Sequence, residues 1–270
     1  MNSISDKAGS ASGSAKSTAS RAADNPLVEW GARLGYGANA VLHFLLAYLT
    51  AQLALGGGDD KQASASGALS TLAEEPAGQV LLWVIAVGFT LLAVWQLTEL
   101  FTRREAFDKA KAGGKLVLYA ALAWSSFTFA SGGRSSSNNQ TKDFTATLMD
   151  APAGQVLVGA VGVAILGIAG YHVYKGWREK FLEDLQEHPG RWAVMAGKVG
   201  YIAKGIALVA VGILFISAAI QHRAGKVTGL DGALQSLRDL PAGTAILLGI
   251  ALGLVAFGVY TFARARYARV

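Results

Sequence analysis

The sequence predicts an all-α membrane protein with six transmembrane helices, which form three tandem helical-hairpin repeats with pseudo-threefold symmetry. The composition points to a membrane, because charged residues make up only 16% of the 270 residues and the mean hydropathy is +0.37. The repeats follow from aligning the chain with itself. Residues 30–99, 106–175 and 195–264 match without a gap at shifts of 76 and 165 residues, and each copy holds two long apolar runs.

Each apolar run is long enough to cross a hydrocarbon core of about 30 Å, which takes roughly 20 helical residues. A helix of a soluble bundle would instead carry a polar face. The sixteen residues between Gln79 and Gln96 contain no charge, and the equivalent segment between Gln155 and His172 contains none either. The predicted spans are residues 34–55, 77–98, 112–131, 153–174, 199–220 and 242–263.

The sequence outside the repeats includes two short terminal segments. Residues 1–29 form an arm rich in Ser, Ala, Gly and Thr, which predicts a disordered cytoplasmic segment without the apolar region of a secretory signal. An organellar transit peptide is the alternative interpretation of the Ser-rich composition, although Asp6 and Asp24 disfavour it. Residues 265–270 form a short cytoplasmic tail.

The distribution of basic residues predicts the orientation in the membrane. Sixteen of the 24 Lys and Arg residues lie in the arm, the second and fourth loops and the tail, against six in the first, third and fifth loops. Both termini are therefore expected to face the cytoplasm. The net charge of +6 is mainly this topological signal, although the basic side could also hold anionic lipid head groups.

The sequence carries no signature of several function classes. Its Lys and Arg residues form no stripe interleaved with aromatic residues, so nucleic acid is not expected as a partner. The absence of Cys excludes disulfides and thiolate metal sites. The four His residues lie in different segments, and no Gly-x-Ser-x-Gly, His-Glu-x-x-His or phosphate-loop motif is present. We therefore expect no metal, no cofactor and no enzymatic activity.

Each outer loop combines a short amphipathic segment with a proline. The segments around Leu69, Leu148 and Leu234 have apolar residues three to four positions apart, which predicts one or two helical turns on the outer surface. A Pro-Ala-Gly sequence follows in every copy, beginning at Pro76, Pro152 and Pro241. Proline suits the start of the second spanning helix, because the N–H that it lacks has no intrahelical partner there.

These features resemble domain of unknown function family 1206, bacterial membrane proteins of three two-helix repeats. The resemblance rests on Arg33-Leu-Gly-Tyr36, on Lys198-Val-Gly-Tyr201 and on the Gly-Ala-Leu and Pro-Ala-Gly segments, and it covers residues 30–264. The middle copy departs from the pattern, because Lys111-Ala-Gly-Gly-Lys115 stands where the other copies have Gly-Tyr. The resemblance implies a bacterial plasma-membrane protein and no known reaction.

Equivalent positions of the three repeats would form rings around a threefold axis. The first ring contains Asn39, Lys115 and Lys204, about 9 Å into the helix from the basic residues Arg33, Lys109 and Lys198 near the start of each repeat. One interpretation is that the lysines extend to the membrane interface along their flexible side chains. The other is that the six residues form an electropositive pocket for an anion or a lipid head group.

A second ring contains Glu99, Lys175 and Arg264 at the cytoplasmic ends of the second helices. Its complementary charges predict either an interhelical ion pair that closes the bundle or a gate that opens when the pair breaks. One turn earlier, His172 is a weaker candidate for a proton relay, since a His within a spanning helix can relay protons near neutral pH. The alternative role for His172 is a hydrogen-bonded anchor beside interfacial aromatic residues.

Small residues occupy one position of the second helix in every copy, at Gly88, Ala164 and Gly253, and Gly249 completes a Gly-x-x-x-Gly motif. They predict close packing of the helices.

For function, the sequence favours a noncatalytic membrane protein that binds membrane lipids, anionic ones included, or that serves as an accessory or scaffold subunit for a membrane-protein partner. The alternative is a small transporter or channel for an anionic solute along the pseudo-threefold axis.

Overall fold

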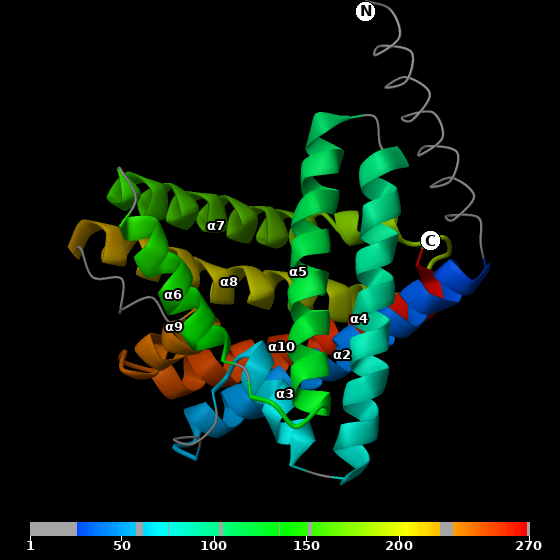
Figure 1. Ribbon diagram of the computed structural model, residues 1–270, viewed down its shortest axis with the longest axis horizontal. Helices are drawn as coiled ribbons and strands as arrows, with labels where there is room; N and C mark the ends of the chain where they lie inside the picture. Colours follow the sequence, from blue (N-terminus) through cyan, green and yellow to red (C-terminus); the bar gives the residue numbers. More distant parts are fainter. Residues whose placement is uncertain are drawn as a thin grey trace, which may run out of the picture.

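The computed structural model describes residues 26–57, 62–74, 76–102, 105–134, 136–150, 153–221 and 229–268. Residues 1–25 of the predicted disordered arm lie outside the described residues, whereas residues 26–29, predicted to be disordered as well, form the first turn of a helix. The six long helices are α2 (Pro26–Ala54), α4 (Pro76–Thr102), α5 (Ala106–Ala130), α7 (Gly154–Trp177), α8 (Arg191–Gln221) and α10 (Gly243–Tyr267). The shorter elements are α3 (Ala65–Ala73), α6 (Ser137–Met149), α9 (Gly229–Arg238) and the 3-10 helix η1 (Lys180–Asp184) (Figure 1). The described ranges contain no strand beyond one isolated bridge between Leu185 and Ala268.

The long helices confirm an all-helical membrane protein. Five of them, α2, α4, α7, α8 and α10, are long and apolar enough to cross a bilayer. The sixth predicted span, residues 112–131, is not confirmed as one. It forms the greater part of α5, but the first half of this helix carries Asp108, Lys109, Lys111 and Lys115, and these charges interrupt its apolar run.

The three amphipathic segments of the outer loops are helical, as predicted, and form α3, α6 and α9. Helix α4 begins at Pro76, whereas α10 begins at Gly243, two residues after Pro241, and Pro152 lies outside the described residues. Ala242 precedes α10 in the left-handed conformation, with φ at 63°. The glycine of the Pro-Ala-Gly sequence is needed for space, since a Cβ atom at Gly243 would overlap the last carbonyl groups of α9.

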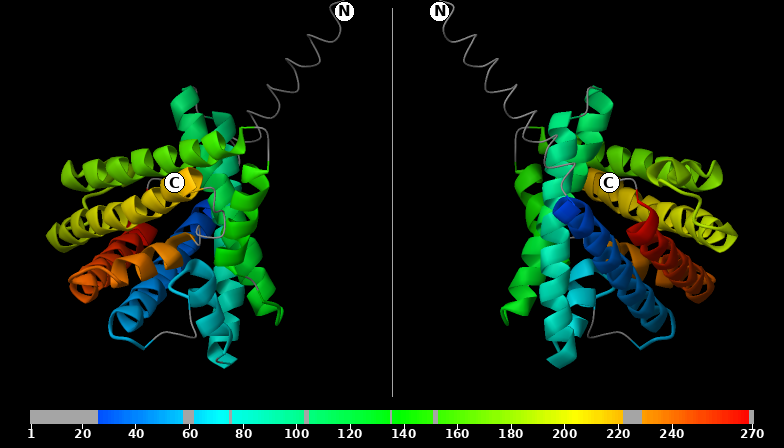
Figure 2. Two further views of the ribbon diagram at one scale, coloured as in Figure 1. Left: turned by 90° about the vertical axis from the view of Figure 1, so that its left-hand side faces the viewer. Right: turned by 90° about the vertical axis from the view of Figure 1, so that its right-hand side faces the viewer.

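The long helices pack as three antiparallel pairs, each of which joins the second helix of one repeat to the first helix of another: α4 with α5, α7 with α8, and α10 with α2. Helices α2 and α4 also pack within their own repeat, as do α8 and α10, whereas α5 and α7 form no comparable interface. The pairs fan out in the order α7/α8, α10/α2 and α4/α5, so that α4/α5 stands steeply across α7/α8 (Figure 2).

We call this arrangement the open fan. Spanning helices that share one bilayer are usually tilted by less than about 40° from its normal, so a closed bundle would need the pairs to lie closer to parallel. The predicted pseudo-threefold symmetry is therefore not confirmed. The helix contacts nevertheless follow a threefold pattern from which one interface within a repeat, α5 with α7, is missing.

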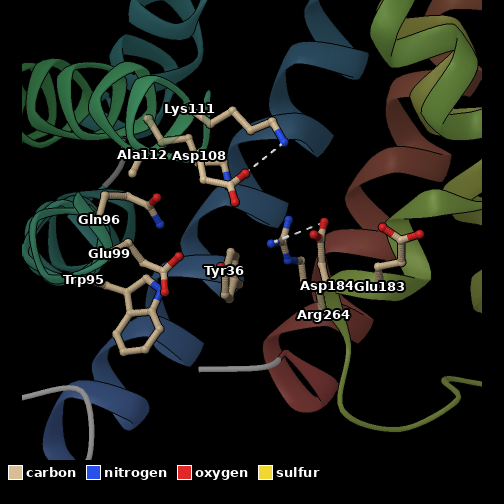
Figure 3. Close-up of a pocket in the computed structure, with 11 residues that line it drawn as sticks. Tyr36, Trp95, Gln96, Glu99, Asp108, Lys111, Ala112, Glu183, Asp184 and Arg264 are labelled. Atoms are coloured by element: carbon tan, nitrogen blue, oxygen red, sulfur yellow. Dashed lines mark hydrogen bonds and ion pairs between the residues drawn. The ribbon is translucent and has the colours of Figure 1, made fainter. Parts of the chain in front are cut away.

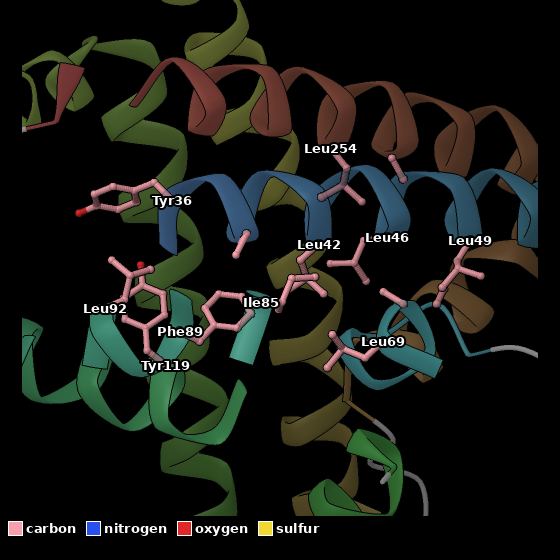
Figure 4. Close-up of a cluster of buried hydrophobic side chains, with 14 of the residues drawn as sticks. Tyr36, Leu42, Leu46, Leu49, Leu69, Ile85, Phe89, Leu92, Tyr119 and Leu254 are labelled. Atoms are coloured by element: carbon pink, nitrogen blue, oxygen red, sulfur yellow. The ribbon is translucent and has the colours of Figure 1, made fainter. Parts of the chain in front are cut away.

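The main apolar core runs along α2 from Tyr36 to Leu53, a length of about 25 Å at 1.5 Å per residue. Ile85 and Phe89 of α4 pack against it (Figure 4). Both side chains are fully buried, as is that of Leu82 on the same helix. The core therefore extends along most of the length of α2 and separates the two ends of the helical pairs. We call the end at which α2, α5 and α8 begin and α4, α7 and α10 end the basic end, and the other end the distal end.

Candidate binding cavity at the basic end

A cavity of about 450 Å³ opens at the basic end, where residues from five elements converge (Figure 3). Its lining consists of Tyr36 from α2, Trp95, Gln96 and Glu99 from α4, Asp108, Lys111, Ala112 and Lys115 from α5, Glu183 and Asp184 from η1, and Arg264 from α10. The volume lies within the range of small-molecule sites. Tyr36 and Trp95 also belong to the apolar core, so the core forms the floor of the cavity.

Asp184 is the central charged group on one wall. Its carboxylate lies 2.6 Å from Nζ of Lys175 at the end of α7 and 3.6 Å from Nη2 of Arg264 at the end of α10. The Arg264 guanidinium also stacks 4.5 Å from the ring centroid of Tyr36, and the Lys175 ammonium lies 5.4 Å from that of Tyr201. One loop carboxylate thus connects two long helices whose cations rest on aromatic rings.

The loop that carries Asp184 is held in place by backbone contacts and aromatic packing. Gln186 donates its N–H to the carbonyl of Tyr267 at 2.8 Å, and the Tyr260 hydroxyl donates to the carbonyl of Phe181 at 3.1 Å. The Phe181 ring is fully buried and lies 5.4 Å from that of Tyr201. The carboxylate is therefore fixed against the ends of α7 and α10.

The ionisation of Asp184 follows from these neighbours. Burial opposes the charged carboxylate, but Arg264, Lys175 and Lys115 favour it, and together they hold the pKa of Asp184 below its ordinary value. Asp184 is consequently an anion at neutral pH.

The cavity as a whole has mixed charge. Four carboxylates, of Glu99, Asp108, Glu183 and Asp184, face three cations. Two of these cations have carboxylate partners, since Arg264 is linked to Asp184 and Lys111 lies 3.3 Å from Asp108. Lys115 has no carboxylate within 4.0 Å among the described residues. The expected electropositive pocket is thus a cavity with charges of both signs.

The six residues of the predicted anion site lie in different places. Lys115 lines the cavity, and Lys109 is exposed on the same helix outside it. Arg33 donates a hydrogen bond of 2.7 Å to the carbonyl of Arg266. Lys198 lies 3.3 Å from the carboxylate of Glu179. In the open fan, the predicted ring does not gather into one site.

Lys204 and Asn39 meet at His43 instead. Nδ1 of His43 lies 2.7 Å from the carbonyl oxygen of Asn39, so this nitrogen carries the proton and donates it. Nε2 then accepts from the Lys204 ammonium at 3.4 Å. The ammonium also lies 4.3 Å from the ring centroid of Phe257. These contacts join α2, α8 and α10 within their membrane-spanning parts.

Of the predicted ion-pair ring, Lys175 and Arg264 meet at Asp184, while Glu99 lines the opposite wall of the cavity (Figure 3). His172 lies apart from the cavity lining. Its Nδ1 is 2.9 Å from the carbonyl of Ile168, one turn earlier, and its ring is 5.8 Å from that of Tyr201. The gate and the proton relay stay predictions.

Two residues of this region were not among the predicted site residues. Asp184 lies in the connection between the second and third repeats, outside the internal alignment that guided the prediction. The sequence of this connection does single it out. It is longer than the connection between the first two repeats, and it contains four carboxylates among basic residues. His43 has no His at its equivalent positions, which are Tyr119 and Leu208, so the repeats give no indication of a site there.

Comparison with known proteins agrees with the repeat organisation. A family model described as Domain of Unknown Function (DUF1206) matches the chain three times, over residues 34–103, 110–179 and 199–268. The matches begin at the same spacing at which the three copies align. The chain is also 29% identical over 256 residues to uncharacterized protein YxxB of Bacillus subtilis (strain 168), covering 90% of this chain and 92% of that protein. No solved structure matches the chain. Since the three matches span most of its length, this protein belongs to the family described as Domain of Unknown Function (DUF1206).

Proposed function

We propose that this protein is a noncatalytic membrane protein of the bacterial plasma membrane that binds a phospholipid head group in the basic-end cavity. Both termini face the cytoplasm in this proposal, so the cavity opens toward the cytoplasmic leaflet. The mixed charge of the lining is the observation that carries the proposal. It suits a head group that contains both a phosphate and a primary amine, as in phosphatidylethanolamine.

The charged groups divide between the two ends of such a head group. Lys115 and Lys111 of α5 would hold the phosphate, because ammonium groups form strong charge-assisted hydrogen bonds with phosphate oxygens. Glu99 and Asp108 would accept hydrogen bonds from the amine. Asp184 and Arg264 have mainly each other and Lys175 as partners, so their role is to fix the wall.

The apolar floor of the cavity supports binding rather than passage. A conduction path would need polar groups or water to continue past Tyr36 and Trp95. Below them lie the fully buried side chains of Phe89, Ile85 and Leu82. The cavity therefore ends where the apolar core begins.

We test the proposal by measuring phospholipid retained on the purified protein by native mass spectrometry. Lys115→Gln is expected to lower the retention of phosphatidylethanolamine about tenfold, equivalent to ~1.4 kcal/mol, because a charge-assisted contact with the phosphate is lost. Lys109→Gln is the matched control, since Lys109 is exposed on the same helix outside the cavity. Equal retention by both variants would contradict the proposed site.

The amine part of the proposal has its own variant. Glu99→Gln is expected to reduce the preference for phosphatidylethanolamine over phosphatidylglycerol, which has no amine. A wild-type protein that preferred phosphatidylglycerol would contradict the amine site and favour a purely anionic ligand.

Transport of an anionic solute is the second candidate function. The observation in its favour is a separate polar hollow at the distal end, lined in part by Gln62, Gln79 and Arg134. The apolar core between the two hollows would then act as a closed barrier. Chloride or phosphate flux into proteoliposomes above that of empty liposomes would support transport, whereas we expect no such flux.

A further inference from the structure

The interface between α5 and α7 is the missing contact of the open fan, and the repeats indicate what it would contain. In the first repeat, a Cβ atom at Gly88 of α4 would lie 3.1 Å from Cα of Gly35 and 3.3 Å from Cβ of Ala38 of α2. In the third repeat, a Cβ atom at Gly253 of α10 would overlap the methyl group of Ala203 of α8. Ala203 is the internal equivalent of Ala38, so the same contact is made twice.

The second repeat has the residues for this contact but does not make it. Ala164 of α7 is the equivalent of Gly88 and Gly253, and Gly114 of α5 is the equivalent of Ala38 and Ala203. Both are exposed, and no side chain or neighbouring helix lies within 4 Å of a Cβ atom built at Gly114. Ala110, one helical turn before Gly114, is small and exposed as well.

The low burial of α7 indicates that the side of this helix that carries Ala164 lacks a helix packed against it. Only 17% of the most apolar part of α7 is buried, against 44–56% for the other four candidate spans. The buried residues of α7, such as Val158, Gly162 and Ala169, do not include Ala164. Small exposed residues on two helices permit the close backbone approach by which membrane helices associate.

From these observations we infer that α5 and α7 pack against each other in a closed state through Gly114 and Ala164, completing the ring of helices. The opening between them, across which the Lys111 ammonium of α5 lies 5.9 Å from the ring centroid of Tyr171 of α7, is then a lateral entrance from the bilayer to the basic-end cavity. Lys111 and Lys115 of α5 line the cavity on one side, and η1, which directly follows α7, lines it on the other. A phospholipid would enter sideways with its acyl chains in the bilayer. The entrance rests on the proposed lipid function, whereas the closure does not.

Cysteine cross-linking tests the closure, because the natural chain contains no Cys and gives no background. The double variant Gly114→Cys/Ala164→Cys is expected to form an intramolecular disulfide when the full-length protein is oxidised in membrane vesicles. In the first repeat, a Cβ atom added at Gly88 would lie 3.3 Å from Cβ of Ala38, near the usual Cβ–Cβ separation of a disulfide, which is about 3.8 Å. Ala38→Cys/Gly88→Cys is therefore the positive control.

The negative control is Gly114→Cys/Val156→Cys. Val156 is 71% exposed, and it lies about 12 Å from Ala164 along α7 at 1.5 Å per residue. Ala110→Cys/Ala164→Cys provides a second test pair that leaves Gly114 unchanged. A disulfide in the positive control but in neither test pair would overturn the closure, and so would a cross-linked product of twice the monomer mass.

The entrance is tested with fluorescent phosphatidylethanolamine added to the same vesicles. The disulfide is expected to slow exchange of the bound lipid at least tenfold, with recovery after reduction. Unchanged exchange in a cross-linked protein would overturn the entrance. Failure of the lipid proposal is distinguishable, because the wild-type protein would then retain no phosphatidylethanolamine although the disulfide still formed.

Discussion

Replacement of Asp184 by Asn is expected to lower the free energy of unfolding by about 2–4 kcal/mol. The amide would leave the cations of Lys175 and Arg264 without their shared carboxylate. These two side chains are only 14% and 17% exposed, so water replaces the lost partner poorly. The measurement is unfolding by SDS in mixed micelles at neutral pH.

Asp108→Asn is the matched control for this substitution. Asp108 also pairs with a lysine, Lys111, but the two side chains are 34% and 39% exposed. Exposed ion pairs of this kind contribute about 0–1 kcal/mol. Equal losses for Asp184→Asn and Asp108→Asn would show that Asp184 does not hold α7 and α10 together.

The pH dependence of stability follows from the lowered pKa of Asp184. The unfolded chain binds a proton at this group more readily than the folded protein, so the contribution of Asp184 is complete above the ordinary carboxyl pKa of about 3.9. It is lost as the pH falls through the folded value. The difference in stability between wild type and Asp184→Asn should therefore be constant near neutrality and shrink below about pH 4. A difference that grew on acidification would contradict the ion pair.

Replacement of Gly253 by Leu is expected to have the second large effect. Even a single added methyl group at Gly253 would overlap that of Ala203, so the larger side chain must push α8 and α10 apart. Overpacking of this kind costs about 1–3 kcal/mol, and more where two backbones touch. Thermal unfolding in detergent should shift to a lower temperature by several degrees.

Gly249 provides the control, because it is a glycine on the same helix, one turn earlier. A Cβ atom at Gly249 has no neighbour within 4 Å, and the residue is exposed. Gly249→Leu is therefore expected to leave the unfolding temperature nearly unchanged. Similar shifts for the two variants would indicate an effect of helix propensity rather than of packing.

The sequence was sufficient for the parts of the fold that depend on local hydropathy and on repetition. Apolar length and the lack of charge predict α2, α4, α7, α8 and α10 as spans, and amphipathic spacing predicts α3, α6 and α9. Helix α5 is harder to assign, because Lys111 and Lys115 lie at the border of its apolar run. Hydropathy alone does not determine whether such a border lies inside the membrane.

The site was harder to predict, because the repeats group residues by equivalent position and the structure does not bring those positions together. Equivalent positions form rings only when all three repeats make equivalent contacts, and the open fan lacks the contact between α5 and α7. Lys204 therefore lies beside His43 rather than near Lys115. Asp184 belongs to no repeat, so an argument from repeats had no position for it.

The central claim is that the basic-end cavity holds a phospholipid head group. An experimental structure of the full-length protein in nanodiscs containing phosphatidylethanolamine and phosphatidylglycerol tests it most directly. The account predicts head-group density in the cavity, with its phosphate beside Lys115 and its amine beside Glu99 and Asp108. A cavity that contained only water, or that continued as a polar path through the layer of Phe89 and Ile85, would contradict the claim.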